Sequence, residues 1–213
     1  MSGAGETLAA TLADAGLPTN AVVEVGPPSA DAPPPPEGPW VVLPFDDTFV
    51  VGGFSRGAFR AYGTVPSREE ARALAVRLAA TEPPLRPVDD AGELVDRGHA
   101  TARAIRERAL ERSGGPGPAQ VSAGAALDLI GPDSAHHLYA LATPFPERAQ
   151  PPSDVGAEYH RYLVLERLPE AREGLASPWF GQPGGGAMVV LDRPVRWYVD
   201  QGMLAELRDS PTA

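Results

Sequence analysis

Three short runs between Trp40 and Val65 have the hydrophobic pattern of β-strands. The first two, WVVLPF and TFVVGGF, are separated by Asp46-Asp47, a pair typical of hairpin turns. The third, AFRAYGTV, alternates aromatic and small residues, as a half-buried strand does. A capping box at Ser67–Glu70 then predicts a helix through about Ala80. Together these elements predict a small α+β module.

Segments of different character flank this module. Gly5–Ala15 has a weak helical period, Ala21–Val25 has the composition of a strand, and Pro27–Pro39 contains four consecutive prolines. Such a proline run favours an extended linker. After the module, Glu82–Pro87 is proline-rich and is expected to end it. Asp90–Arg112 has the pattern of a second, longer helix.

Beyond the run SGGPGP at Ser113–Pro118 the chain becomes rich in strand-like segments, namely ALDLI, HLYAL, YHRYLVLERL and AMVVL. Proline-rich loops separate them. The segment Pro194–Leu207 is predicted to be the last helix, because its apolar residues share one face and proline suits the first helical turn. The predicted fold is therefore α+β, with a mainly antiparallel, twisted sheet and flanking helices in the C-terminal part.

Three regions follow from this organisation. Residues 1–39 are expected to form a helix, a strand and the linker, and residues 40–112 the small α+β accessory module with a connecting helix. Residues 119–213 are expected to form the main domain. The domain boundary is placed near SGGPGP, with the preceding helix free to pack on either side.

Composition narrows the function. The chain has 213 residues, of which 43% are hydrophobic, so it can bury a globular core. A net charge of -10 argues against sequence-independent binding to nucleic acid or to an anionic membrane. The sequence contains no Cys and no Lys, which excludes thiolate and lysine nucleophiles. It shows no bilayer-spanning run and no ordinary signal peptide, so a cytoplasmic protein or export by a specialised route is expected.

The stretch SPWFGQPGGGAM, at Ser177–Met188, is the first candidate for chemistry. It is followed by a strand-like run rather than a helix, so it is neither a Walker loop nor a dinucleotide fingerprint. Glycines let a ligand approach the backbone, and the amide of Gln182 offers both donors and acceptors. We expect the glycines to clear space for a ligand that Gln182 contacts. The plain alternative is a glycine-rich loop joining two strands.

Arg148 and the histidines are the other candidates. Arg148 lies in a proline-stiffened loop, where it would either bind a phosphate bidentately or be a solvated loop arginine. His160 and Tyr162 would share one face of a strand, and a structural histidine is the alternative reading. His136 and His137 would point to opposite faces if both lay in a strand, so they are not expected to chelate one ion, and no metal site is predicted.

The segments HLYALATPFPERAQPP, EYHRYLVLERLP and GLASPWFGQPGGGAMVVLDRPVRWYVDQGMLAEL together resemble the tuberculosis necrotizing toxin (TNT) family. These domains are NAD glycohydrolases found in bacterial polymorphic toxins, with relatives in fungi. The resemblance covers about Ala119–Leu207, through four ordered motifs. It implies hydrolysis of the nicotinamide–ribose bond of NAD to give nicotinamide and ADP-ribose. NAD would be the substrate, no cofactor would be needed, and an immunity protein would be a partner.

The resemblance also implies site residues. Gln182 would orient the ribose or the attacking water, Arg148 would bind phosphate, and His160 would position the reacting ribose. The sequence departs from the family at Leu129, which stands where the family has an arginine. An alternative is therefore a catalytically weakened domain that binds a nucleotide or a protein partner; an interaction module built on the proline-rich linkers explains less. Substrate-binding positions would be His137, Phe180, Gly181 and Gly184, and Arg161 or Arg103 would compensate for Leu129.

Overall fold

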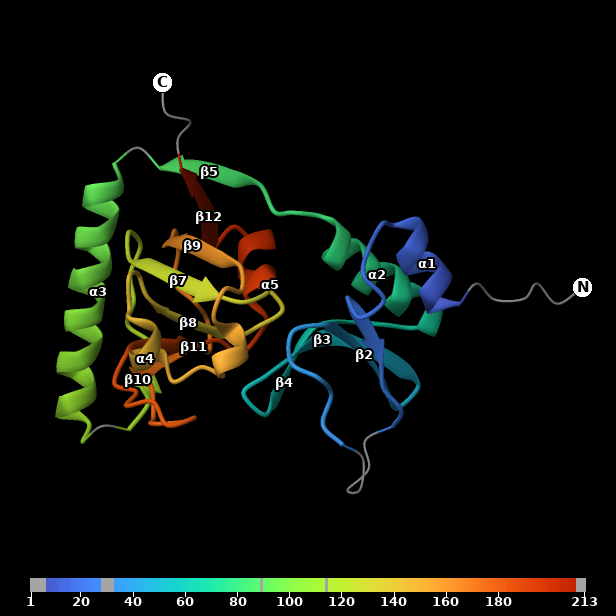
Figure 1. The fold of residues 1–213 in the computed structure, drawn as a ribbon, viewed down its shortest axis with the longest axis horizontal. Coiled ribbons are helices and arrows are strands. Elements are labelled where there is room, and N and C mark those ends of the chain that lie inside the picture. Colours follow the sequence, from blue (N-terminus) through green and yellow to red (C-terminus); the bar gives the residue numbers. More distant parts are fainter. Residues whose placement is uncertain (1–6, 28–32, 89, 114, 210–213) are drawn as a thin grey trace, which may run out of the picture. The chain divides into compact units, whose positions relative to one another are not determined.

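The computed structural model describes residues 7–27, 33–88, 90–113 and 115–209. The chain divides into two compact units, Met1–Glu82 and Pro83–Ala213. In the first unit, the elements are α1 (Leu8–Asp14), β1 (Val22–Glu24), β2 (Trp40–Phe45), β3 (Thr48–Ser55), β4 (Ala58–Val65) and α2 (Arg68–Ala80) (Figure 1).

The first unit is a four-stranded sheet covered by helices, in the strand order β1-β2-β3-β4. β1 runs parallel to β2, and the other neighbours are antiparallel. The predicted capping box is confirmed, because the Ser67 side chain accepts a hydrogen bond from Glu70 N. Trp40 and Val51 from the sheet pack with Leu12 of α1 and Ala75 of α2 in one core. The three strands and the helix predicted here are confirmed.

The second unit contains an eight-stranded sheet in the order β5-β12-β9-β7-β8-β11-β10-β6. Only the edge pair β5–β12 is parallel, so the predicted α+β fold with a mainly antiparallel sheet is confirmed. The strands are β5 (Leu85–Val88), β6 (Gly117–Pro118), β7 (Ala126–Ile130), β8 (His137–Ala140), β9 (Tyr159–Val164), β10 (Arg172–Leu175), β11 (Ala187–Val190) and β12 (Leu204–Asp209). The helices are α3 (Ala91–Glu111), α4 (Phe145–Arg148) and α5 (Val195–Asp200), with a short 3-10 turn at Pro152–Asp154.

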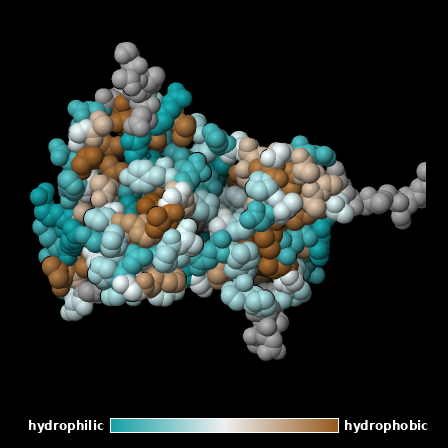
Figure 2. Space-filling view, viewed as in Figure 1, coloured by the Kyte–Doolittle hydropathy of each residue, from teal (hydrophilic) through white to brown (hydrophobic). Residues whose placement is uncertain are grey.

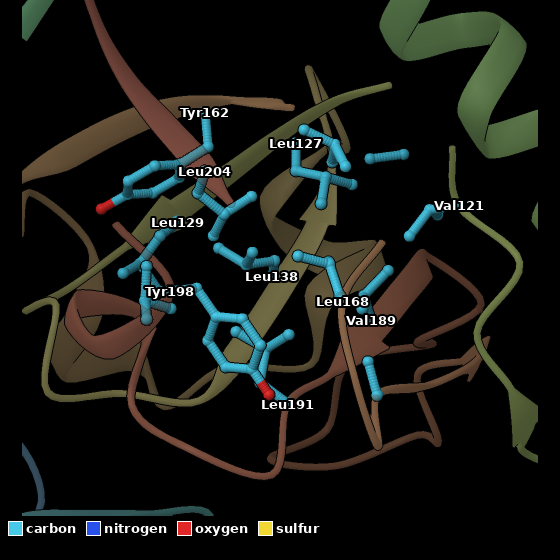
Figure 3. Packing of buried hydrophobic residues seen from close by; sticks show 14 of the residues in the cluster. Val121, Leu127, Leu129, Leu138, Tyr162, Leu168, Val189, Leu191, Tyr198 and Leu204 are labelled. Carbon is cyan, nitrogen blue, oxygen red and sulfur yellow. The ribbon is translucent and has the colours of Figure 1, made fainter. Parts of the chain in front are cut away.

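The main core of this unit lies on one face of the central strands (Figure 3). Leu127 and Leu129 of β7, Leu138 of β8 and Tyr162 of β9 meet Tyr198 of α5 there. Each such side chain is at most 2% exposed, and burying one contributes about 1.5–3 kcal/mol. On the surface, hydrophobic residues occur in small groups among polar ones on the visible side (Figure 2). No helix among the described residues is both long and apolar enough to cross a membrane.

The predicted helix at 194–207 is wrong in its second half. α5 ends at Asp200, Gly202 takes a φ of 73°, and the chain then enters β12. β12 lies between β5 and β9, so its backbone groups are paired on both sides. Sheet pairing in the tertiary structure outweighs the local helical pattern there.

The segment after Glu82 belongs to the second unit. Leu85–Val88, expected to be a proline-rich break, forms β5, where Pro87 is tolerated because the strand lies at the edge of the sheet. α3 runs along the ends of β7, β8, β11 and β10 (Figure 1). It comes so close that a Cβ on Gly98 would lie 2.7 Å from Leu141 Cβ. The compact units therefore separate at residues 82 and 83, and the expected functional division at 113–118 stays a prediction.

Candidate active site

The loop that carries Gln182 is a tight turn with two exposed aromatic residues. Gln182 N donates to Trp179 O at 2.8 Å, and the residues between them, Phe180 and Gly181, have φ values of 51° and 73°. Two positive φ values in succession are typical of a type I′ turn. A left-handed Phe costs about 1–2 kcal/mol. The rings of Trp179 and Phe180 stack at 4.3 Å and are 47% and 44% exposed. Strain that exposes two aromatic rings favours a binding function for the turn.

The glycines after Gln182 pack against the chain itself. A Cβ on Gly184 would lie 2.5 Å from Ala176 O, and one on Gly186 would lie 2.8 Å from Glu147 O. Gly184 N and Gly186 N also donate to Pro146 O and Glu147 O, at 3.3 and 2.9 Å. Glycine at 184 is therefore explained by close packing, because a side chain there would meet the 176–178 segment. The hydrogen bonds to Pro146 O and Glu147 O hold the Gln182 loop beside α4. A ligand contact at Gly184 stays a prediction.

The Gln182 side chain takes part in a chain of amide hydrogen bonds. Its Nε2 donates to Gln150 O at 2.6 Å. The Gln150 side chain, 8% exposed, donates from its own Nε2 to Ile130 O at 3.0 Å and to Asp154 Oδ2 at 3.1 Å. Within the part of the chain that the structure describes, no donor reaches Oε1 of either glutamine. Leaving a buried acceptor unsatisfied costs about 1–3 kcal/mol.

Arg148 is buried, although it was expected either to be solvated in a loop or to face a phosphate. It is 2% exposed. Its Nε donates to Thr143 O at 2.9 Å, and its Nη2 donates to Asp128 Oδ2 at 2.7 Å. The same carboxylate oxygen accepts from Tyr159 Oη at 2.9 Å. Burial raises the pKa of the Asp128 carboxyl, and the hydrogen bond from Arg148 only partly offsets this rise. Arg148 thus anchors the loop after β8 to the sheet.

His160 lies on the other face of the sheet. In the β7–β9 register Leu129 is opposite His160 and Asp128 is opposite Arg161, and successive side chains alternate between faces. His160 therefore shares the face of Leu129 and, as predicted, of Tyr162. The centroids of the His160 and Tyr162 rings lie 6.3 Å apart in a stacked arrangement. The structure brings the Arg148 and Gln182 loops together, whereas His160 is separated from Arg148 by the sheet.

His160 has its own acidic partners. Its Nδ1 lies 2.6 Å from Glu206 Oε1, and Glu158 and Asp133 are also close enough to influence it. Burial lowers the pKa of His160, but the hydrogen bond to Glu206 and the charges of these three carboxylates raise it, and the net direction is upward. His160 is therefore held more firmly in its protonated form by the folded protein than by the unfolded chain.

This shift predicts a pH dependence of stability. A histidine whose pKa is raised by folding stabilises the protein fully below its unfolded pKa of about 6.5. The contribution is lost as pH rises through the folded value. We expect Glu206→Gln to remove most of this contribution, so that the free energy of unfolding of the variant changes less across that pH window. Urea unfolding of the wild-type protein and of Glu206→Gln at a series of pH values measures this difference. If the free energies of unfolding of the two proteins change in parallel with pH, Glu206 does not raise the pKa of His160.

His137 lies beside His136, with ring centroids 4.2 Å apart. The expectation that the two point to opposite faces is wrong, because His136 precedes β8 and does not follow its alternation. Within β8, His137 shares a face with Tyr139, whose ring lies 4.9 Å from the Arg148 guanidinium carbon. His137 is thus placed on the same face as Arg148. In the described ranges no three His, Asp or Glu residues are grouped as metal ligands would be.

Sequence reasoning missed three residues that organise this region. Asp128 had a signal, because a carboxylate inside the apolar run ALDLI must find a partner when buried. Gln150 and Glu206 had no such signal in the sequence. Their partners, Gln182 and His160, lie 32 and 46 residues away along the chain. Only the folded chain shows what they contact.

Comparison with known proteins concerns the C-terminal half. The model of the family described as tuberculosis necrotizing toxin matches residues 120–207. The conidial surface nicotinamide adenine dinucleotide glycohydrolase nadA of Aspergillus fumigatus is 33% identical over 101 residues, which cover 44% of this chain and 43% of the relative. The chain thus spans less than half of that protein. A solved structure of tuberculosis necrotizing toxin complexed with its immunity factor shares 24% identity, with a TM-score of 0.34, over 47% of this chain and 52% of that one.

Proposed function

We propose that the protein is an NAD glycohydrolase that hydrolyses the nicotinamide–ribose bond to nicotinamide and ADP-ribose, because the model of the tuberculosis necrotizing toxin family matches residues 120–207. The relative named as a nicotinamide adenine dinucleotide glycohydrolase supports this activity. The observation that carries the proposal is the Gln182 loop: a strained turn beside α4 that exposes two aromatic rings and leaves an amide oxygen without a donor among the described residues.

The proposed reaction depends little on proton transfer by the protein. Nicotinamide leaves as a neutral group, so the reaction needs no general acid. The transition state is oxocarbenium-like, and water adds to the ribose carbon that nicotinamide leaves. A site for this reaction must position the substrate and keep other water out. In the proposed enzyme Gln182 contacts the nicotinamide riboside end of NAD from its turn.

The arginines have different proposed roles. Arg148 has a positioning role, because its guanidinium is bound to Asp128 and to Thr143 O. The carbonyl groups of Pro146 and Glu147, just before Arg148, hold the Gln182 loop in place. Arg161 lies on the same face of the sheet as Asp128, and we assign to it the contact with the pyrophosphate. His160 lies on the opposite face of the sheet. It would act indirectly, because its contact with Glu206 links β9 to β12.

A second function has an observation of its own. Leu129 is 2% exposed within the main core, and Arg148 is equally buried. Neither position offers a charge to a phosphate at the surface. This favours a weakened domain that binds a nucleotide or a protein partner without turning NAD over.

Nicotinamide release from NAD by the purified chain tests the two functions. We expect the wild-type protein to release nicotinamide and Gln182→Ala to lower kcat/KM by about 100-fold or more, the loss typical for one positioned polar group. Gln201→Ala, at an exposed glutamine just after α5, is the matched control and should retain activity. Full turnover by a folded Gln182→Ala variant would exclude Gln182, and saturable NAD binding without release would select the second function.

An immunity protein is a proposed partner, and this proposal rests, like that of NAD as substrate, on the similarity to the tuberculosis necrotizing toxin family. An enzyme that consumes NAD would harm the cell that makes it, so a producing cell needs a protein that blocks the site. The exposed aromatic turn at Trp179 and Phe180 is the surface that such a protein would cover.

A further inference from the structure

Glu173 of β10 carries a buried carboxylate that is bound by the C-terminal end of α3 (Figure 1). Its side chain is 0% exposed. Arg108 Nε donates to Oε1 at 2.6 Å and Arg108 Nη2 donates to Oε2 at 2.9 Å, which are the two parallel bonds of a bidentate arginine–carboxylate pair. Gln120 N also donates to Oε2, at 3.0 Å. Both carboxylate oxygens therefore have donors, and these bonds fix β10 against α3.

Arg112, directly after α3, contacts the same residue. Its Nη2 donates to Glu173 O at 3.3 Å and lies 3.6 Å from Glu173 Oε1. Gly117 of β6 is opposite Glu173 in the sheet, and a Cβ on Gly117 would lie 2.5 Å from Arg112 Nε. The Arg112 side chain thus packs directly on β6. We call Glu173 with Arg108, Arg112 and Gln120 N the Glu173 clamp; it joins the end of α3 to β10.

β10 leads from this clamp to the Gln182 loop. It pairs with β11 along its whole length. Directly beyond the paired residues, Ala176 N donates to Gly186 O at 2.9 Å, and Gly185 N donates to Ala176 O at 2.8 Å. These two bonds close the base of the loop. The place at which the Trp179–Gln182 turn begins therefore depends on where β10 is held.

α3 also contacts the second support of the loop. Arg106 Nη2 donates to Glu147 Oε2 at 2.7 Å, and Glu147 O accepts from Gly186 N. The Arg106–Glu147 side chains are 45% and 35% exposed, so this pair contributes less than the buried clamp. α3 precedes residues 120–207, which the family model matches. A helix outside the matched residues thus contacts both supports of the loop.

We propose that Arg108 and Glu173 are positioning residues for the Gln182 loop, so that α3 is part of the functional unit. The clamp holds the strand from which the Trp179–Gln182 turn extends, and it acts on a substrate only through that turn. Its effect on nicotinamide release rests on the proposed function, whereas its effect on the order of the turn does not.

The tryptophan residues provide a probe of the turn that needs no activity. The chain has three: Trp40 in β2, Trp197 in α5 and Trp179 in the turn. Fluorine NMR of protein labelled with fluorotryptophan gives a resonance for each, and Trp179→Phe identifies the one from the turn. Arg108→Lys keeps the charge beside Glu173 but loses the parallel pair of bonds. We expect it to shift or broaden the Trp179 resonance and to leave that of Trp40 unchanged.

The double variant Arg108→Met with Glu173→Leu separates positioning from stability. It replaces both charges by apolar side chains of similar size, so the free energy of unfolding should stay close to that of the wild type. It lacks the parallel bonds, and we expect a changed Trp179 resonance. We also expect kcat/KM for nicotinamide release to fall about 100-fold, because moving a contacting group by about 1 Å can cost this much. A role in stability alone would leave both unchanged.

Glu93→Gln is the matched control on the same helix. It breaks the exposed pair of Glu93 and Arg97, whose atoms are 2.6 Å apart, and Arg97 contacts Gly124 O rather than β10. The Trp179 resonance and nicotinamide release should both remain those of the wild type.

The two measurements distinguish failure of the inference from failure of the proposed function. An unchanged Trp179 resonance in folded Arg108→Lys and in the double variant would overturn the inference, whatever the activity. A changed resonance in a protein whose wild type releases no nicotinamide would support the clamp while the proposed function fails. Full turnover by a double variant with a changed resonance would overturn the role of the clamp in the reaction.

Discussion

Asp128→Asn is expected to lower the free energy of unfolding by about 3–5 kcal/mol, the usual cost of leaving one partner of a buried ion pair uncompensated. Asp128 is fully buried, and Arg148 beside it is 2% exposed. The variant keeps the size of the side chain and removes its charge, so the Arg148 guanidinium remains in the interior without a counterion. Urea unfolding of the variant beside the wild-type protein measures the change.

The exposed pair of Arg106 and Glu147 provides the control. Its atoms are 2.7 Å apart, but the two side chains are 45% and 35% exposed. Glu147→Gln should therefore cost less than about 1 kcal/mol. The double variant Asp128→Leu with Arg148→Met removes both buried charges and should recover much of the loss. An effect of Asp128→Asn as small as that of Glu147→Gln would show that the pair does not hold the loop as described.

Leu129→Arg is the second change with a large expected effect. It restores the residue type that the resemblance places at this position, yet Leu129 is packed with Leu127, Leu138 and Tyr162 in the main core. A guanidinium there would be desolvated beside His160, whose pKa is already raised. We expect a loss of about 3–5 kcal/mol in the free energy of unfolding and no gain in nicotinamide release.

Leu129→Met is the matched control, because a hydrophobic change of similar volume usually costs less than about 1.5 kcal/mol. Thermal unfolding and nicotinamide release are measured for both variants. A stable Leu129→Arg protein with higher turnover would show that the arginine reaches a substrate from this position, which would move the site to the His160 face.

Local signals in the sequence were enough for the regular elements that rely on neighbours in the chain. The capping box at Ser67 predicted α2, and the acidic residue Asp90 caps α3 by accepting from Glu93 N. The alternation of AFRAYGTV predicted β4. Two strands were not recognised, although ALDLI and AMVVL of similar length were. β5 was taken as a break because it contains Pro87, and β12 was taken as part of a helix because it follows the helical pattern of α5 closely.

The sequence identified most of the candidate residues but not how they are arranged in space. The motif SPWFGQPGGG directed attention to Gln182, and the TPFPER and YHRY stretches to Arg148 and His160. The sequence could not show that Arg148 is buried against Asp128 or that His160 lies on the opposite face. Face and burial depend on strand register, and register is decided by pairing across the sheet.

By itself the sequence determined the α+β class, the resemblance of residues 120–207 to a known family, and the loops that carry the candidate residues, because these depend on residue types at fixed spacing. Only the tertiary structure decided that residues 83–118 complete the C-terminal unit, that Gly184 serves close packing, and that Gln150 and Gln182 leave two acceptors without donors among the described residues. The reason is physical: burial and hydrogen-bond satisfaction depend on groups far apart in the chain, and those meet only after folding.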